Sequence, residues 1–286
     1  MITLRKDIIA QFKRHLEELE RSPATIKKHM RNLQILTQYA GDAIKDRTQL
    51  NNFRAYLREN QYASGTINSI LGTVNKFLAY MNERGLCTET WRLRGEKVQR
   101  RTFLSSQKEL TLAEYKRLIR TALSCGKKQL AMLMQTICAT GIRVSELKAI
   151  TVECLAVGQA VVQNKGKERI ILIPADLVKA LRRYCRDHSI TEGIIFSTKK
   201  GNPLDRSNIW RMMKNLAEKA KVAAEKVFPH NLRHLFAVTY YNETHDIARL
   251  ADLLGHSSVD TTRIYTATSS QTEREVINRL QLTVPI

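Results

Sequence analysis

The chain has 286 residues, a length that favours two domains of roughly 150 residues each, and 43% of its residues are hydrophobic, which is enough to build folded cores. Lysine and arginine total 47 against 27 aspartate and glutamate, so the net charge is +20. This composition argues against a disordered polycation, and the uncompensated charge indicates a polyanionic partner such as nucleic acid, with an anionic membrane surface as the lesser alternative.

The pattern of apolar residues excludes two kinds of segment. Residues Met1–His15 alternate charged and apolar side chains, unlike a secretory signal, and the apolar stretch Leu130–Ala139 is too short to span a bilayer. We therefore expect a soluble cytoplasmic protein. Its five cysteines are odd in number and have no CxxC spacing, so we expect free thiols and neither a disulfide framework nor a metal site.

The first hundred residues show helical spacing of apolar side chains, interrupted by capping and terminating residues. Ser22 followed by Pro23 predicts a helix start, and Gly41 predicts its end. The last of these helices should run from Ser64 to Gly85. Together with helices at the chain start and around residues 50–57, this predicts a four-helix domain over residues 1–95.

Polar and basic residues occupy the positions of these helices that the apolar stripes leave open. Such side chains suit contacts with DNA phosphates and base edges, although a solvated helix surface would show the same pattern. The candidate DNA-binding residues are Lys27, Lys28, Arg31, Asn68, Asn75 and Lys76.

A polar, basic stretch at residues 96–107 predicts a linker, and a second domain follows over residues 108–286. Thr111 and Glu114 have the spacing of a capping box at its first helix. Helical periodicity dominates this domain, but Gly158–Pro174 predicts a β-hairpin around a Lys-Gly turn, and Ile150–Leu155 a third strand. The expected fold is mainly α, with a small three-stranded antiparallel sheet.

Four segments of the second domain gather basic side chains and tyrosine without a matching cluster of carboxylates. The segment TGIRVSEL places Arg143 in the first turn of a helix behind Gly141, where it can reach an anion or pair with Glu146. The hairpin turn KGKER carries Lys165 and Lys167, which are ordinary residues for a solvated turn.

The other two segments contain histidine. In HNLRH, His230 and Arg233 share a helix face and suit one phosphate, whereas the His230 and His234 pair lacks the glutamate of a zinc motif and stands beside a cation. In LLGHSSVDTTRIYT, Gly255 ends a helix at His256, and Tyr265 follows nine residues later. We therefore expect anion chemistry and no metal.

In this order and spacing, TGIRVSEL, KGKER, HNLRH and LLGHSSVDTTRIYT resemble the tyrosine recombinases of the phage integrase family. The resemblance implies a SAM-like core-binding domain followed by a catalytic domain, acting on double-stranded DNA without a cofactor. It also implies a homotetramer on DNA at the nucleoid, alone or with a second recombinase. The residues that match the family's catalytic set are Arg143, Lys165, His230, Arg233, His256 and the nucleophile Tyr265.

The chemistry explains these residue types. Guanidinium groups can fork onto the nonbridging oxygens of a phosphodiester, and the histidines can orient or deprotonate the nucleophile. Lys165 is the candidate general acid for the leaving alkoxide, although the hairpin is one residue shorter than KGxKxR, so Lys167 remains the alternative. The resemblance implies a 3′-phosphotyrosine and strand exchange through a Holliday junction.

Two other functions fit parts of this pattern. A type IB topoisomerase shares the basic residues and the tyrosine but would reseal the same strand, and a non-catalytic DNA-binding protein would need no nucleophile. The apolar residues near the end of the chain, among them Val276 and Leu280, predict a tail that packs either on its own domain or on a neighbouring protomer.

Overall fold

The structure is a computed structural model, and it describes residues 1–88, 90–96, 109–164, 167–256 and 258–263. The chain divides into two compact units, Met1–Arg100 and Arg101–Ile286. Each unit has its own hydrophobic core, as two separate clusters of buried side chains show.

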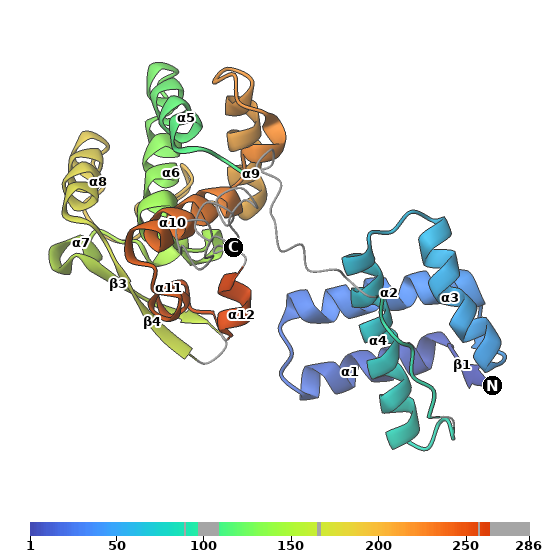
Figure 1. Ribbon diagram of the computed structural model, residues 1–286. Helices are drawn as coiled ribbons and strands as arrows, with labels where there is room; N and C mark the ends of the chain where they lie inside the picture. The colour runs from blue at the N-terminus through green and yellow to red at the C-terminus, as the bar shows by residue number, and fades with distance from the viewer. Residues whose placement is uncertain (89, 97–108, 165–166, 257, 264–286) are drawn as a thin grey trace, which may run out of the picture. The chain divides into compact units, whose positions relative to one another are not determined.

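Helices build the amino-terminal unit (Figure 1). They are α1 (Lys6–Glu18), α2 (Pro23–Ala40), α3 (Arg47–Glu59) and α4 (Ser64–Glu83). The start of α2 was predicted correctly, because the Ser22 hydroxyl accepts a hydrogen bond from the backbone N–H of Thr25 at 3.3 Å. Phe12, Phe53 and Phe77 are almost fully buried between the helices.

A short antiparallel ribbon closes this unit and was not predicted. Strand β1 (Ile2–Thr3) pairs with β2 (Ala43–Ile44), with Ile2 opposite Ile44. Both isoleucines are buried, so the ribbon fastens the start of the chain to the core. Two residues per strand are too few to show an alternating pattern in the sequence.

Most of the carboxy-terminal unit is helical as well. Its helical elements among the described residues are α5 (Leu112–Ser124), α6 (Lys128–Thr140), η2 (Val144–Ala149), α7 (Cys154–Val157), α8 (Ala175–Asp187), α9 (Arg206–Ala217), η3 (Ala224–Lys226), α10 (Pro229–Thr244), α11 (Ile247–Leu254) and α12 (Val259–Thr262). The capping box at the start of α5 is present, formed by Thr111 and Glu114 as predicted.

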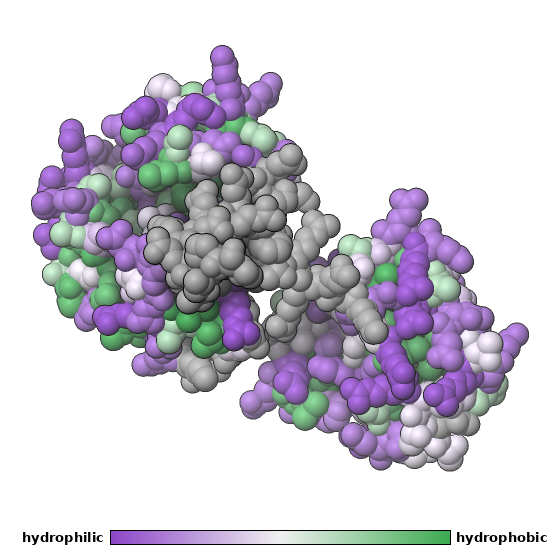
Figure 2. Space-filling model, in the orientation of Figure 1, coloured by the Kyte–Doolittle hydropathy of each residue, from purple (hydrophilic) through white to green (hydrophobic). Residues whose placement is uncertain are grey.

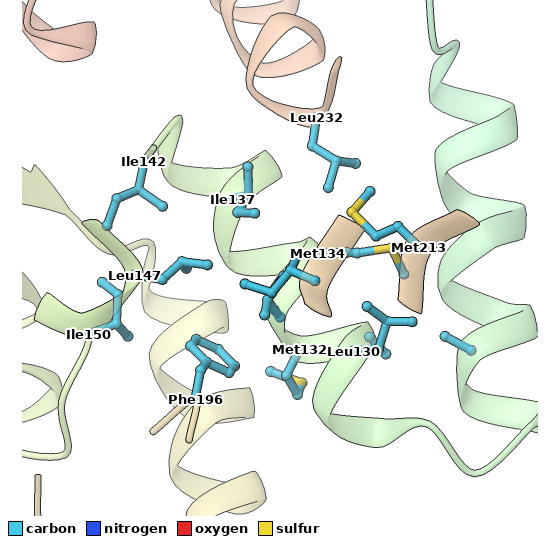
Figure 3. Packing of buried hydrophobic residues seen from close by; sticks show 14 of the residues in the cluster. Leu130, Met132, Met134, Ile137, Ile142, Leu147, Ile150, Phe196, Met213 and Leu232 are labelled. Atoms are coloured by element: carbon cyan, nitrogen blue, oxygen red, sulfur yellow. The ribbon is translucent and has the colours of Figure 1, made fainter. Parts of the chain in front are cut away.

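Helix α6 forms the centre of this unit's core. It is apolar on nearly every side, which is the pattern of a fully enclosed helix, and it packs against α5, α8 and α10. Figure 3 shows Met134 and Ile137 of α6 beside Leu232 of α10, with Ile142 and Leu147 in the same buried cluster. The chain on either side of Arg143 is therefore held by the core.

The predicted three-stranded sheet is a two-stranded hairpin in the described residues. Strands β3 (Gln159–Asn164) and β4 (Lys167–Leu172) pair antiparallel, but Thr151 makes only an isolated bridge with Ile194. The expected third strand ends there because the chain turns into α7. The overall class, mainly α with small antiparallel sheets, is as predicted.

Polar side chains cover most of the visible face of each unit, with apolar residues scattered among them (Figure 2). None of the helices in the described part of the chain is long and apolar enough to cross a membrane.

Candidate active site

The segment that carries Arg143 begins where α6 ends. Gly141 has a φ of +63°, and a Cβ atom there would lie 2.5 Å from Cδ1 of Phe236, so the turn requires glycine for both its conformation and its contact with α10. Arg143 follows in an extended conformation and precedes η2. The prediction that it lies inside the first helical turn was wrong, because the chain enters a 3₁₀ helix one residue later.

The C-terminal end of α11 brings three arginines together. Its last carbonyl groups have no partner within the helix, and each accepts a hydrogen bond from a different element. The donors and distances are Arg169 to Leu253 at 3.1 Å, Arg233 to Leu254 at 2.6 Å and Arg143 to Gly255 at 2.9 Å. Figure 1 shows β4, α11 and α12 side by side in this region. We call the three arginines, together with Glu146 and His256, the α11-end cluster.

Arg233 is the most enclosed of these arginines, with an exposed fraction of 3%. It lies in the second turn of α10, and besides Leu254 it donates to the carbonyl of Gly141 at 2.6 Å. Its guanidinium also lies 3.2 Å from Nε2 of His256. Arg233 therefore joins the end of α6, the end of α11 and the histidine that follows it.

His256 is held from both sides of its ring. Nδ1 lies 2.8 Å from the hydroxyl of Thr262, a fully buried residue of α12. Because Arg233 can only donate, Nε2 accepts and Nδ1 carries the proton that Thr262 receives. Partial burial and the positive charges of Arg233, Arg143 and other nearby residues lower the pKa of His256 to about 4, so the ring is neutral at pH 7.

His230 lies at the first turn of α10 and is exposed. Burial of part of its ring and the positive charges of Arg233 and other neighbours lower the pKa of His230. His234, one turn further on, lies 3.3 Å from a carboxylate oxygen of Glu109. No group of three or more residues suited to hold a metal ion occurs within the described ranges.

Two residues of this site were not found from the sequence. The sequence predicts Glu146 only as a partner of Arg143, which it is at 2.9 Å, but Glu146 also binds Arg169 at 2.6 Å. Arg169 is the last residue of the KGKER segment, and the sequence predicts no role for it. The sequence contains no signal for a pair 23 residues apart on different elements.

Lys165 and Tyr265 lie outside the described residues. For both of them the role stated above stays a prediction. The described part of the candidate set, Arg143, His230, Arg233 and His256, comes from three segments far apart in the sequence, and hydrogen bonds connect Arg143, Arg233 and His256 around Leu254 and Gly255.

The candidate DNA-binding residues of the amino-terminal unit fall into two groups. The four basic side chains, Lys27, Lys28, Arg31 and Lys76, are exposed on α2 and α4. Lys28 and Lys76 both lower the pKa of the buried His29, after the larger effect of burial itself. The basic residues of α2 and α4 thus lie near one another.

The side-chain amides of the two asparagines form hydrogen bonds with the backbone of the same unit. The Asn68 side chain accepts from the backbone N–H of Glu96 at 2.6 Å and donates to its carbonyl at 3.0 Å. Asn75 forms the same pair of bonds with Leu93. These amides fasten residues 93–96 to α4, and Glu96 also forms an ion pair with Arg58 at 2.9 Å.

A basic cavity beside this fastened segment was not predicted. It has a volume of about 640 Å³, and Arg47, Arg92 and Arg94 contribute to its lining, which includes no carboxylate among the described residues. All three arginines are exposed. The segment after α4 therefore adds positive charge to the amino-terminal unit.

Comparison with known proteins assigns the chain to a class. The sequence profile of the phage integrase family matches residues 108–272, more than half of the chain. The chain belongs to this family and is a tyrosine-type site-specific recombinase.

Among curated proteins it is similar to the tyrosine recombinase XerA of Pyrococcus furiosus, with 30% identity over 98% of this chain and 96% of the relative. The corresponding protein of Thermococcus kodakarensis is 29% identical over 96% of both chains.

Solved structures share the fold. The site-specific recombinase XerH bound to its difH substrate superimposes with a TM-score of 0.70 at 18% identity, covering 95% of this chain and 85% of that one. A lambda integrase dimer bound to a core site gives a TM-score of 0.73 at 19% identity, with 93% and 96% coverage.

Proposed function

We propose that this protein cleaves and rejoins duplex DNA at specific sites through a covalent phosphotyrosine at Tyr265. Its residues 1–95 and 108–286 would hold the DNA from two sides, with residues 96–107 as the strap between them. The observation that carries this proposal is the α11-end cluster, in which Arg143, Arg233 and His256 are fixed within one hydrogen-bonded group.

In the first step, the phenol oxygen of Tyr265 attacks the scissile phosphorus and forms a bond to it. Arg143 and Arg233 stabilise the negative charge that develops on the nonbridging oxygens, which is the part of the reaction where fixed cations act most strongly. The bond from phosphorus to the 5′ oxygen breaks, and Lys165 gives that oxygen a proton.

The product is a 3′-phosphotyrosine and a free 5′-hydroxyl. A 5′-hydroxyl of a second DNA strand then attacks the phosphotyrosine, so the strand is rejoined without an external energy source. Four protomers on two sites would carry out two such exchanges through a Holliday junction, at the nucleoid in the cytoplasm. The apolar tail beyond Tyr265 would join neighbouring protomers or pack on its own domain.

The low pKa of His256 bears on the first step. A ring with a pKa of about 4 is a weak base, because protonation would place a second cation against Arg233. A bound phosphate brings negative charge that offsets the arginines and raises this pKa. His256 thus becomes able to take up the phenol proton when the scissile phosphate is in place.

In the amino-terminal unit, the proposed DNA contacts are the exposed Lys27, Lys28, Arg31 and Lys76. Asn68 and Asn75 would contribute indirectly, because their amides hold residues 93–96 next to the basic cavity.

The test is formation of a covalent adduct on a DNA site selected from a random pool by binding. The wild-type protein should form an adduct on a denaturing gel, and Tyr265→Phe should bind the same DNA without forming it. An undiminished adduct with Tyr265→Phe would refute the assignment.

A plasmid carrying two sites tests the alternative of a topoisomerase. Recombinant products are expected, whereas relaxation without recombinants would favour a type IB enzyme, which rejoins the same strand after strand rotation.

A further inference from the structure

Arg169 is a nearly buried cation next to the candidate active site, and no catalytic role has been assigned to it. It lies on β4 opposite Val162, on the inward side of the hairpin, and its side chain is 10% exposed. Besides its bond to the carbonyl of Leu253, it binds Glu146 at 2.6 Å. Burying a charge is costly unless it is paired, so Arg169 needs Glu146 at this position.

Glu146 in turn serves two guanidinium groups. Its side chain is 7% exposed, and Oε1 accepts from Arg143 at 2.9 Å. Oε2 accepts both from the backbone N–H of Arg143 at 2.9 Å and from Arg169. A single buried carboxylate therefore lies between the proposed catalytic arginine and a second arginine behind it.

The charges of these three residues decide what Arg143 can do. Glu146 and Arg143 alone form a neutral pair, in which the carboxylate weakens the pull of the guanidinium on a phosphate. With Arg169 present, the group carries one net positive charge. Because Arg143 has an exposed fraction of 28%, well above those of its two partners, this charge is presented at the surface by Arg143.

Arg169 also supports the turn that carries His256. A Cβ atom on Gly255 would lie 2.8 Å from Cδ of Arg169 and 3.1 Å from one of its terminal nitrogens. The arginine side chain thus packs directly against the backbone of Gly255, whose φ of +59° places the next residue. Arg143 binds the carbonyl of the same glycine.

From these contacts we infer that Arg169 is a positioning residue for DNA cleavage, because it compensates the charge of Glu146 and supports the Gly255 turn. Arg143 can then act on the scissile phosphate. Arg169 does not itself touch the DNA in this arrangement. The inference rests on the proposed function and adds to it a residue on the hairpin.

A double-mutant cycle tests the charge compensation. The variants are Arg169→Met, Glu146→Gln and both together, and the measurement is the single-turnover rate of covalent cleavage at saturating DNA. We expect Arg169→Met to lower this rate by about 10-fold to 100-fold, a range typical of coupled buried charges, with DNA affinity within about 2-fold of wild type. In the double variant Glu146→Gln removes the carboxylate, so there is no negative charge left to compensate. The cleavage rate of the double variant should therefore exceed that of Arg169→Met.

Two further variants separate positioning from folding. Arg169→Lys keeps the charge, and its rate should recover to between those of Arg169→Met and wild type. Arg117→Met is the matched control: Arg117 donates to the carbonyls of Ala220 and Lys221 at 2.8 and 3.0 Å, in the same unit but away from the α11-end cluster. It should lose thermal stability and keep the cleavage rate of wild type.

The outcomes are distinct. A wild-type rate with Arg169→Met, or a double variant whose loss is the product of the two single losses, would overturn the inference. If the Arg169→Met protein does not fold, the same comparison is made with Arg169→Gln, which also removes the charge, alone and combined with Glu146→Gln. A wild-type cleavage rate with Arg169→Gln would overturn the inference as well. Absence of any adduct with the wild-type protein would instead refute the proposed function.

Discussion

Two regions of this protein are rich in positive charge, and they hold it in different ways. In the α11-end cluster, Arg233 and Arg169 are almost buried, and each has two or more defined partners within the chain. On α2 and α4 of the amino-terminal unit, the basic side chains are exposed, and none of them forms an ion pair with a carboxylate of the described residues.

The difference in burial corresponds to a difference in expected function. A charge fixed before the substrate arrives needs no reorganisation during the reaction, so the α11-end cluster is suited to stabilise a transition state. Exposed lysines and arginines are screened by salt and interact with a phosphate backbone mainly through charge. The first region should therefore set the rate of cleavage, and the second should set DNA affinity.

Loss of an arginine in the cluster should have the largest effect. Arg233→Ala should lower the single-turnover cleavage rate by about 10³-fold or more, in the range found when an arginine that stabilises phosphoryl transfer is removed. It also leaves the carbonyls of Gly141 and Leu254 without this donor, so we expect a lower melting temperature. A rate within a few-fold of wild type would contradict the role assigned to Arg233.

Changes to the exposed basic residues of α2 and α4 should affect DNA affinity and not the cleavage rate. Replacing Lys27, Lys28, Arg31 and Lys76 together by glutamine should weaken DNA binding and reduce the slope of log affinity against log salt by up to roughly 3.6, since each phosphate contact contributes about 0.9. Cleavage at saturating DNA should stay near the wild-type rate. An unchanged salt dependence would show that DNA does not lie on this face.

The low pKa of His256 predicts that this residue contributes to the pH dependence of stability. Between pH 6.5 and about 4, the unfolded chain binds a proton at His256 that the folded protein does not. The free energy of unfolding should therefore fall as the pH falls through this window, and the contribution of His256 is fully present above pH 6.5. Denaturant unfolding of His256→Asn should show a weaker loss over this range, and an equal loss in both proteins would contradict the assignment.

We expect the smallest effect from loosening the segment after α4, and this effect is on stability. Asn75→Ala removes two hydrogen bonds to Leu93 and should destabilise the amino-terminal unit by about 1–2 kcal/mol, measured by denaturant unfolding. Asn60→Ala is the matched control, because Asn60 makes one exposed bond to the carbonyl of Tyr56 and should cost about 0.5 kcal/mol or less. Equal losses in the two variants would argue against a fastening role for Asn75.

The sequence predicted the features that depend on neighbouring residues. Ser22 caps α2, and Gly141 and Gly255 end α6 and α11, because capping and left-handed glycine turns are decided within a few residues. The placement of Arg143 before a 3₁₀ helix was missed, since an α-helical and a 3₁₀ start have similar signals.

Long-range contacts were beyond such reasoning. The bond between Glu146 and Arg169 joins η2 to β4, and Asn68 and Asn75 of α4 bind a backbone segment that follows by about 20 to 30 residues. A polar side chain shows its residue type in the sequence but not which distant group will satisfy it. For this reason the two asparagines were predicted as DNA contacts.

If the proposed function is correct, the guanidinium groups of the α11-end cluster act on the negative charge of the scissile phosphate. A DNA site in which a neutral methylphosphonate replaces that phosphate tests it directly, by comparing the cleavage rates of wild type and Arg143→Ala on both substrates. We expect Arg143→Ala to lower the cleavage rate much less on the neutral substrate, because less charge develops there. The same reduction in cleavage rate on both substrates would contradict this role of the arginines.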